Sequence, residues 1–213
     1  MNTLECSSRG DRRFSAFYAK VDVFGKPASI EEHYQLSKVF LSKPKPMSDR
    51  GIIGVKRQFS TVKEVKDFQK KGNEPKEFRL NDTFYPVQYL SSWYKLLWVK
   101  YLDKHPELVD FASQFEDFTD MFRGKSINCQ ADVIRQYVKT GRASVMHDCR
   151  DFLCLLKCSN ESFKSDIEND LTEVENYFWE QYKKASFRVV PGHWPEFKAK
   201  PRLITGSPEI MTR

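Results

Sequence analysis

The sequence predicts an α+β fold, a helix-rich single domain with a few short strands. The chain has 213 residues, a length typical of one domain, and its 17 Phe, 9 Tyr and 4 Trp residues can fill one core. Apolar residues follow a helical period through most of the second half, whereas stretches of aromatic and β-branched residues are short. We expect the domain to span residues 1–190 and the proline-containing residues 191–213 to form an irregular tail.

The first expected elements are a strand and a capped helix. Residues 14–24 are dense in aromatic and β-branched side chains and stop before a glycine, which indicates a strand followed by a turn. Ser29 stands three residues before Glu32, the spacing of a capping box, so a helix should begin here. Apolar residues with helical spacing extend this helix to Leu41, before Pro44.

A loop, a second capped helix and a strand follow. Residues 42–59 have the composition of a loop. The next helix is expected to begin at Ser60 or Thr61 and to end at Gly72. Residues 78–87 should contain one short strand, broken by a proline.

Helices are expected to dominate the rest of the chain. Pro106 is placed to be the first residue of a helix, and Gly141 is placed to end another. We expect residues 117–124 to close the helix that Pro106 opens, and residues 187–190 to form a short strand. The other helices are expected over 90–102, from Asn128 or Cys129 to Val138, around 152–156 and around 167–178.

The cysteine count and the hydropathy pattern indicate a cytoplasmic protein. The five cysteines are an odd number in a chain too large to need a disulfide framework. The N-terminal residues lack the apolar segment of a secretory signal, and no run approaches the ~18 apolar residues of a membrane helix. We therefore expect free thiols, a reducing compartment and no membrane partner.

Positive charge is concentrated in the first third of the chain. Residues 1–80 hold 17 Lys plus Arg against 10 Asp plus Glu, whereas residues 81–213 hold 18 against 19. The basic segment 38–79 is compatible with contacts to the phosphates of a nucleic acid. The alternative is a solvated helix face, because its charged residues have the spacing of exposed helix positions. Its aromatic residues do not alternate with its lysines as a platform for stacking single-stranded bases requires.

The capped helix after Ser29 carries the first candidate site. On a helix, Glu31, Gln35 and Lys38 are spaced to line one face with a carboxylate, an amide and an ammonium group. The strand before this helix would bring a hydroxyl group and two aromatic rings near that face, those of Ser15, Phe17 and Tyr18. Together they can form a small polar pocket with an aromatic wall. The alternative is that Glu31 favours the helix dipole and Lys38 is solvated.

Two strings in this region resemble the opening of the NADAR family. RFSAFYAKV and SIEEHYQLSK are similar in order and separation to the family's Leu-Ser-Asn-Phe-Tyr and Ser-Val-Glu-His-Tyr-Tyr-Gln motifs, with a lysine nearby. Ala16 stands where the family usually has Asn, and the family's closing Trp-Gly motif has no clear counterpart. The resemblance implies a helix-rich α+β domain with pocket residues at Ser15, Phe17, Tyr18, Glu31, Tyr34, Gln35 and Lys38.

The segment 123–137 is a second candidate. Its Gly-Lys-Ser string lacks the upstream glycine of a phosphate loop, since Thr119 occupies that position, so a nucleoside triphosphatase is excluded. A second interpretation is that a helix begins at Asn128, Cys129 and Gln130 and that this helix start forms part of the pocket wall. The backbone N–H groups of a helix start favour a bound anion. Cys129 would then have a lowered pKa and be reactive. The alternative is an ordinary helix start followed by a core helix.

A third cluster, His147 with Cys149, Cys154 and Cys158, has ligand types that suit zinc. Its spacing does not match a zinc motif, and buried thiols on a core helix explain it, so we expect no metal.

The resemblance implies an enzyme or binder for a phosphorylated N-riboside, such as an ADP-ribosyl group, possibly on nucleic acid. The reaction would be cleavage of an N-glycosidic bond, with Glu31 and Lys38 as the candidate catalytic residues. Arg12, with its neighbours Arg9 and Arg13, is the candidate for binding phosphate. No cofactor is implied. The alternative function is non-catalytic binding of nucleic acid by the basic segment 38–79.

Overall fold

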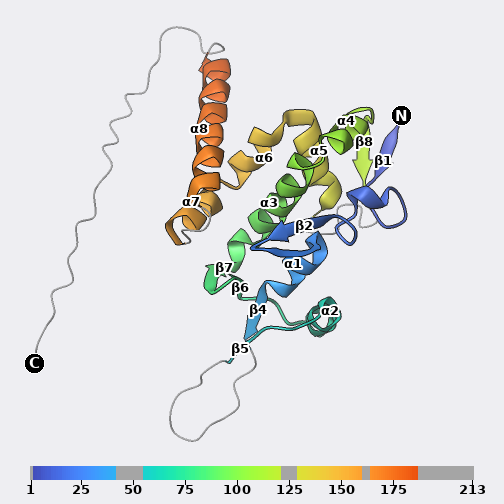
Figure 1. The fold of residues 1–213 in the computed structure, drawn as a ribbon, viewed down its shortest axis with the longest axis vertical. Coiled ribbons are helices and arrows are strands. Elements are labelled where there is room, and N and C mark those ends of the chain that lie inside the picture. The colour runs from blue at the N-terminus through green and yellow to red at the C-terminus, as the bar shows by residue number, and fades with distance from the viewer. Residues whose placement is uncertain (1, 42–54, 121–128, 160–163, 187–213) are drawn as a thin grey trace, which may run out of the picture.

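The computed structural model describes residues 2–41, 55–120, 129–159 and 164–186, and Figure 1 shows the arrangement of their elements. The α+β class is confirmed. Eight helices are present in these ranges: α1 (Ile30–Leu36), α2 (Val62–Lys70), α3 (Leu90–Asp103), α4 (Pro106–Ser113), α5 (Gln130–Thr140), α6 (Arg142–Asp148), α7 (Arg150–Ser159) and α8 (Lys164–Ser186). The short 3-10 helices are η1 (Arg12–Phe14) and η2 (Val87–Tyr89).

The strands are short and form three separate sheets. A parallel pair joins β1 (Thr3–Glu5) to β8 (Asp117–Thr119), and an antiparallel hairpin joins β2 (Lys20–Val23) to β3 (Lys26–Ser29). The third sheet has four antiparallel strands in the order β5-β4-β6-β7. These strands are β4 (Lys38–Leu41), β5 (Lys56–Arg57), β6 (Glu77–Leu80) and β7 (Thr83–Pro86).

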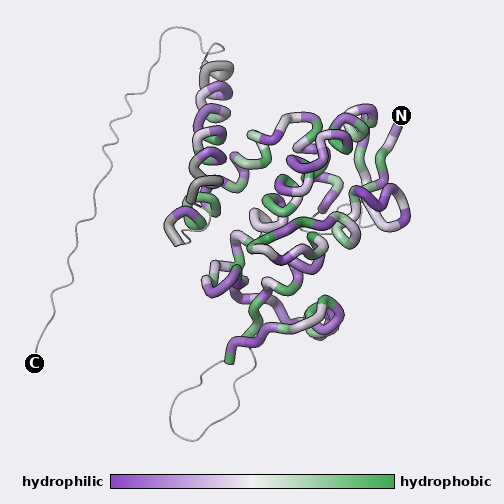
Figure 2. Tube along the Cα trace, in the orientation of Figure 1, coloured by the Kyte–Doolittle hydropathy of each residue, from purple (hydrophilic) through white to green (hydrophobic). Residues whose placement is uncertain are grey.

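Helix α3 runs through the middle of the molecule, with α5 beside it (Figure 1). Its residues Leu97, Trp98 and Leu102 are buried, and they belong to the same core as Phe14 and Ile134. In Figure 2 hydrophobic and hydrophilic stretches alternate along the chain. No helix in the described ranges is long and apolar enough to cross a lipid bilayer.

The sequence prediction was wrong about the first strand. Strand β2 begins only at Lys20 because the preceding aromatic residues turn instead of extending. The Asp11 side chain accepts a hydrogen bond from the Arg13 N–H group and starts η1. The carbonyl of Ser15 then accepts hydrogen bonds from the N–H groups of Tyr18 and Ala19, both at 2.9 Å. These bonds fold the FSAFY string into a compact turn.

The predicted helix from Ser29 to Leu41 is shorter than expected. Helix α1 ends at Leu36, where the Ser37 hydroxyl donates a hydrogen bond to the Tyr34 carbonyl at 2.9 Å. The residues after it form β4, because their aromatic and β-branched side chains favour a strand and β6 offers a pairing partner. Lys38 is therefore the first residue of a strand.

Several other expectations are confirmed and some are corrected. The capped start of α2 at Thr61, Pro106 at the start of α4 and Gly141 at the end of α5 are as predicted. Residues 117–119, expected to close a helix, form β8 instead because they pair with β1. The single strand expected in 78–87 is the β6–β7 hairpin, and α6 was not predicted. The expected strand at 187–190 and tail at 191–213 lie outside the described residues.

Candidate functional site

The turn after η1 and the first turn of α1 are joined by backbone hydrogen bonds. The Glu31 N–H group donates to the Ala16 carbonyl and the Ile30 N–H group donates to the Ala19 carbonyl, both at 2.9 Å. Helix α1 therefore starts directly against the turn that carries Phe17 and Tyr18. This contact brings together the two strings that the sequence analysis assigned to one site.

The two adjacent glutamates of α1 have different partners. The Ser29 N–H group donates to Glu32 Oε2 at 2.9 Å, and the Glu32 N–H group donates to Ser29 Oγ at 3.2 Å, which completes the capping box. These hydrogen bonds from Ser29 lower the pKa of Glu32. Glu32 therefore closes the cap, whereas the side chain of Glu31 points toward α2.

Glu31 is the first member of a chain of polar contacts. Its Oε1 atom lies 2.6 Å from Lys66 Nζ and accepts a hydrogen bond from Gln35 Nε2 at 3.2 Å. Gln35 Oε1 in turn accepts a hydrogen bond from Lys38 Nζ at 2.8 Å. Both Lys66 and Gln35 bind Oε1, so the described residues leave Oε2 available to a ligand. The carboxylate is thus oriented through one of its two oxygens.

Lys38 is a buried lysine with a perturbed proton affinity. It is 4% exposed, its Nζ also reaches Gln69 Oε1 at 3.4 Å, and it lies 4.2 Å from the centre of the Tyr34 ring. Burial lowers the pKa of Lys38 to about 8, although the charge of Glu31 acts in the opposite direction. A group with a pKa near the working pH can both give and take a proton.

Aromatic rings border the polar chain. Phe17 and Tyr18 are 47% and 48% exposed, and each has a cation over its face. Lys66 Nζ lies 4.5 Å from the centre of the Phe17 ring, and the Arg12 guanidinium lies 5.2 Å from that of Tyr18. Tyr34, in contrast, is packed edge-on against Tyr94 at 5.0 Å, below the surface. The exposed rings can stack on a ligand, whereas Tyr34 supports Lys38.

The start of α5 supports this site from behind. Gln130 Oε1 accepts a hydrogen bond from the Ala16 N–H group at 3.0 Å, and Gln130 Nε2 donates to the Cys6 carbonyl. Both ends of this amide therefore hold backbone, one at Ala16 in the turn that carries Phe17 and the other at Cys6, just after β1. Asn128 lies outside the described residues. Ser15, on the same turn, has a buried hydroxyl with no hydrogen-bond partner in the described ranges.

The thiol of Cys129 does not have the lowered pKa considered in the sequence analysis. Burial, together with the hydrogen bond from Cys129 Sγ to Asp120 Oδ2 at 3.1 Å, raises the pKa of this thiol to about 12. A neutral thiol is a poor nucleophile, so the geometry favours the alternative of an ordinary helix start.

Comparison with known families matches the same part of the chain. The model of the DarT1-associated NADAR antitoxin family matches residues 1–168. The chain belongs to this NADAR family. No curated protein matches it. The matched residues include every residue of the site described above and end within α8, so most of α8 lies beyond the family match.

Sequence reasoning missed the contribution of α2 to the candidate site of this NADAR chain. Lys66 and Gln69 are three residues apart on this helix, and both reach side chains of the site, Glu31 and Lys38 respectively. Their spacing indicates only that they share a helix face. Nothing local to residues 62–70 shows that this face packs beside α1.

Four cations of the basic segment 38–79 are buried or paired in the described part of this NADAR chain. Lys38 is buried and Lys66 pairs with Glu31. Lys56 pairs with Glu77 at 2.6 Å, and Arg79 pairs with Asp82 at 2.6 Å. These pairings direct the cations toward different partners.

The suspected metal cluster is dispersed where the structure describes it. Cys149 is buried, Cys154 is exposed, and the side chain of Cys158 lies outside the described residues. The described ranges of this NADAR chain contain no group of three potential metal ligands.

Proposed function

We propose that this chain hydrolyses the N-glycosidic bond between an ADP-ribosyl group and a base, with the modified base carried on DNA. The observation that supports this proposal best is the polar chain Lys66, Glu31, Gln35, Lys38, which places a fixed carboxylate and a lysine of low pKa in one site. The family description, an antitoxin associated with DarT1, supports a role in opposing a toxin. The free thiols of Cys6, Cys129, Cys149 and Cys154 suit a reducing, cytoplasmic compartment.

Hydrolysis of this N-glycosidic bond needs one group that stabilises positive charge on the sugar and one group that donates a proton to the leaving base. Cleavage of the bond between the base nitrogen and the anomeric carbon develops positive charge on the sugar, which a carboxylate stabilises. Glu31, whose Oε2 is available, takes this role and directs a water molecule to the anomeric carbon. The water oxygen bonds to that carbon and loses a proton, while the base leaves with the bonding electrons and accepts a proton. Lys38, with a pKa of about 8, is largely protonated at pH 7 and is the candidate donor to the base.

Binding of the substrate would use the border of the site. The exposed rings of Phe17 and Tyr18 offer faces on which a base stacks. The Arg12 guanidinium, next to Tyr18, suits a phosphate group because its planar fork matches two phosphate oxygens.

The test is chromatographic detection of the products of N-glycosidic cleavage, ADP-ribose from the modified DNA and free base from the riboside, over a panel of three substrates. These are an ADP-ribosylated single-stranded oligonucleotide, the same oligonucleotide annealed to its complement, and a phosphorylated aminopyrimidine riboside. We expect release from ADP-ribosylated DNA and its loss in Phe17→Ala. Release of base only from the small riboside would contradict the DNA substrate. Salt-sensitive binding of unmodified DNA with no release from any substrate would favour the non-catalytic alternative.

A further inference from the structure

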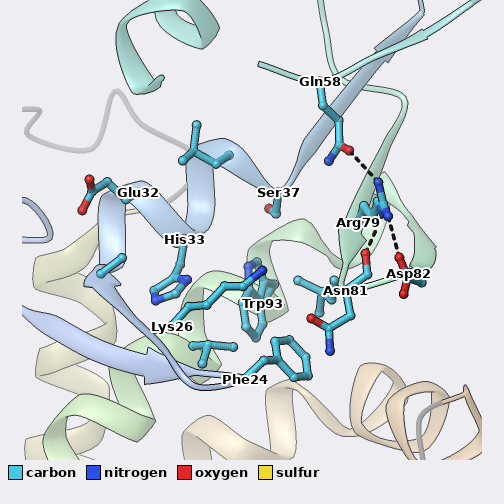
Figure 3. A pocket seen from close by; sticks show the side chains of 14 residues that line it. Phe24, Lys26, Glu32, His33, Ser37, Gln58, Arg79, Asn81, Asp82 and Trp93 are labelled. Atoms are coloured by element: carbon cyan, nitrogen blue, oxygen red, sulfur yellow. Dashed lines mark hydrogen bonds and ion pairs between the residues drawn. The ribbon is translucent and has the colours of Figure 1, made fainter. Parts of the chain in front are cut away.

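A cavity lies on the side of α1 away from Glu31 and Gln35. It has a volume of about 590 Å³, within the size range of small-molecule sites. Figure 3 shows it between the turn of the β2–β3 hairpin, helix α1, the turn of the β6–β7 hairpin and Trp93 of α3. Three α1 residues line it, Glu32, His33 and Leu36, whereas Glu31 and Gln35 face the glycosidase site. The helical period separates the two sets, so the two sites share α1 but not its side chains.

Both hairpin turns place a residue of unusual backbone conformation at this cavity. Phe24, with φ of 56°, and Asn81, with φ of 50°, are the non-glycine residues of positive φ in the described ranges, and both line the cavity. Asparagine tolerates this region, whereas phenylalanine adopts it only with backbone strain. Strained residues of this kind are concentrated at ligand-binding and catalytic sites. The half-buried ring of Phe24 packs against the edge of the core and also lines the cavity.

The charged groups of the cavity leave one cation without an acidic partner. Asp82 pairs with Arg79 at 2.6 Å, and Glu32 is held by the Ser29 cap. Lys26, on β3, has no carboxylate within ion-pair distance in the described part of the chain. The cavity thus presents an ammonium group to an anion.

Neutral donors and acceptors in the wall are also available. The side-chain oxygen of Gln58 accepts a hydrogen bond from Arg79 at 3.3 Å, which leaves the side-chain NH₂ group of Gln58 to other partners. The side-chain amide of Asn81 makes no hydrogen bond to the described residues. The indole N–H group of Trp93 is buried without a hydrogen-bond partner in those ranges. Trp93 and Phe24 supply aromatic surface to the same space (Figure 3).

We propose that this cavity binds a planar heteroaromatic ring that carries one phosphate, the chemistry of a nucleoside monophosphate. The rings of Phe24 and Trp93 provide its apolar contact surface. The ammonium group of Lys26 pairs with the phosphate. The side-chain amides of Asn81 and Gln58 form hydrogen bonds with the edge of the ring, as such amides do with adenine. The proposal does not depend on the glycosidase activity.

Calorimetric titration with adenosine 5′-monophosphate tests this proposal. Two variants probe the cavity without disturbing the turns: Asn81→Gly removes the amide, and Phe24→Asn removes the ring, while both new residues accept a positive φ. Lys26→Ala removes the cation. We expect each of the three to weaken binding at least about tenfold. Lys20→Ala, an exposed lysine on the same hairpin outside the cavity lining, is the matched control and should bind like the wild type.

Further arms of this titration separate the two sites and the two parts of the ligand. Phe17→Ala, which alters the proposed glycosidase site, should leave the Lys26-dependent binding of adenosine 5′-monophosphate unchanged. Adenosine and inorganic phosphate should each bind more weakly than the monophosphate. A 5′-phosphorylated single-stranded oligonucleotide that competes for the Lys26-dependent site would assign it to a strand end, and failure to compete would assign it to the free nucleotide; both support the proposal. No heat with the monophosphate, or binding lost in Phe17→Ala and kept in Lys26→Ala, would overturn it.

Discussion

The Nζ atom of Lys66 lies 2.6 Å from the Oε1 atom of Glu31, and the same ammonium group lies over the ring of Phe17. One side chain from α2 therefore connects the carboxylate of α1 with an aromatic ring of the N-terminal turn. This contact gives α2 a direct part in shaping the candidate site, since Lys66 pairs with one of the two carboxylate oxygens of Glu31.

Replacement of Lys66 should impair catalysis more than binding. In Lys66→Ala the Glu31 carboxylate loses its cationic partner and its fixed orientation, so we expect kcat to fall by up to about a hundredfold. Steady-state kinetics of ADP-ribose release measure this effect. Lys63→Ala, on the exposed side of the same helix, is the control. Equal loss of activity in both variants would show that the overall charge of α2 matters and the contact with Glu31 does not.

Lys38 should make the protein less stable at neutral pH. Its pKa falls from 10.5 to about 8 on folding, so the unfolded chain binds more protons than the native state between these values, and stability rises with pH across this window. Lys38→Met should therefore be more stable than the wild type at pH 7, by up to about 3 kcal/mol. Urea unfolding at several pH values measures the difference. The difference in unfolding free energy between Lys38→Met and the wild type should shrink between pH 8 and 10.5. A difference that does not change with pH would contradict the burial of a charged Lys38.

Gln130 should stabilise two parts of the N-terminal backbone, the turn at Ala16 and the residue after β1, through the two ends of its amide. Gln130→Ala leaves the buried Ala16 N–H group and the Cys6 carbonyl without this partner, at a cost of about 2 kcal/mol. The Tm should fall by roughly 4–8 °C in thermal unfolding. Gln114→Ala, at an exposed position, should leave the Tm nearly unchanged. A Tm unaffected by Gln130→Ala would show that water replaces these bonds easily.

Arg142 should anchor helix α8 to the rest of the domain. Its guanidinium pairs with Glu173, with Asp170 at 2.6 Å and with Asp103 of α3 at 2.9 Å. Arg142→Ala should speed amide hydrogen exchange in α8 by about tenfold to a hundredfold, because charge-assisted hydrogen bonds are lost. Arg150→Ala, an exposed arginine on α7, serves as the control. Unchanged exchange in α8 would mean that apolar contacts alone hold the helix.

Local sequence signals predicted the elements that depend on local interactions. The capping boxes at Ser29 and Thr61 and the glycine at 141 act within a few residues of themselves, and the helix boundaries they predict are present. The contact between Glu31 and Gln35 follows in the same way from their spacing on one helix.

Other features depend on partners that are distant in the chain. Residues 38–41 and 117–119 become strands because β6 and β1 pair with them, and no local pattern contains that pairing. The approach of Lys66 to Glu31 likewise depends on the packing of α2 beside α1. The aromatic string after Arg13 was misread as a strand because its hydrogen bonds are made within a turn, which composition does not reveal.

The two adjacent glutamates of α1 offer the most direct test of the proposed mechanism. Single-turnover release of ADP-ribose from ADP-ribosylated DNA should be compared in Glu31→Gln and Glu32→Gln. We expect Glu31→Gln to reduce the rate by at least about a hundredfold with little change in Tm. Glu32→Gln should retain activity and lose about 1 kcal/mol of stability, since it weakens the Ser29 cap. Full activity in Glu31→Gln would contradict the assignment of this carboxylate to the cleavage of the glycosidic bond.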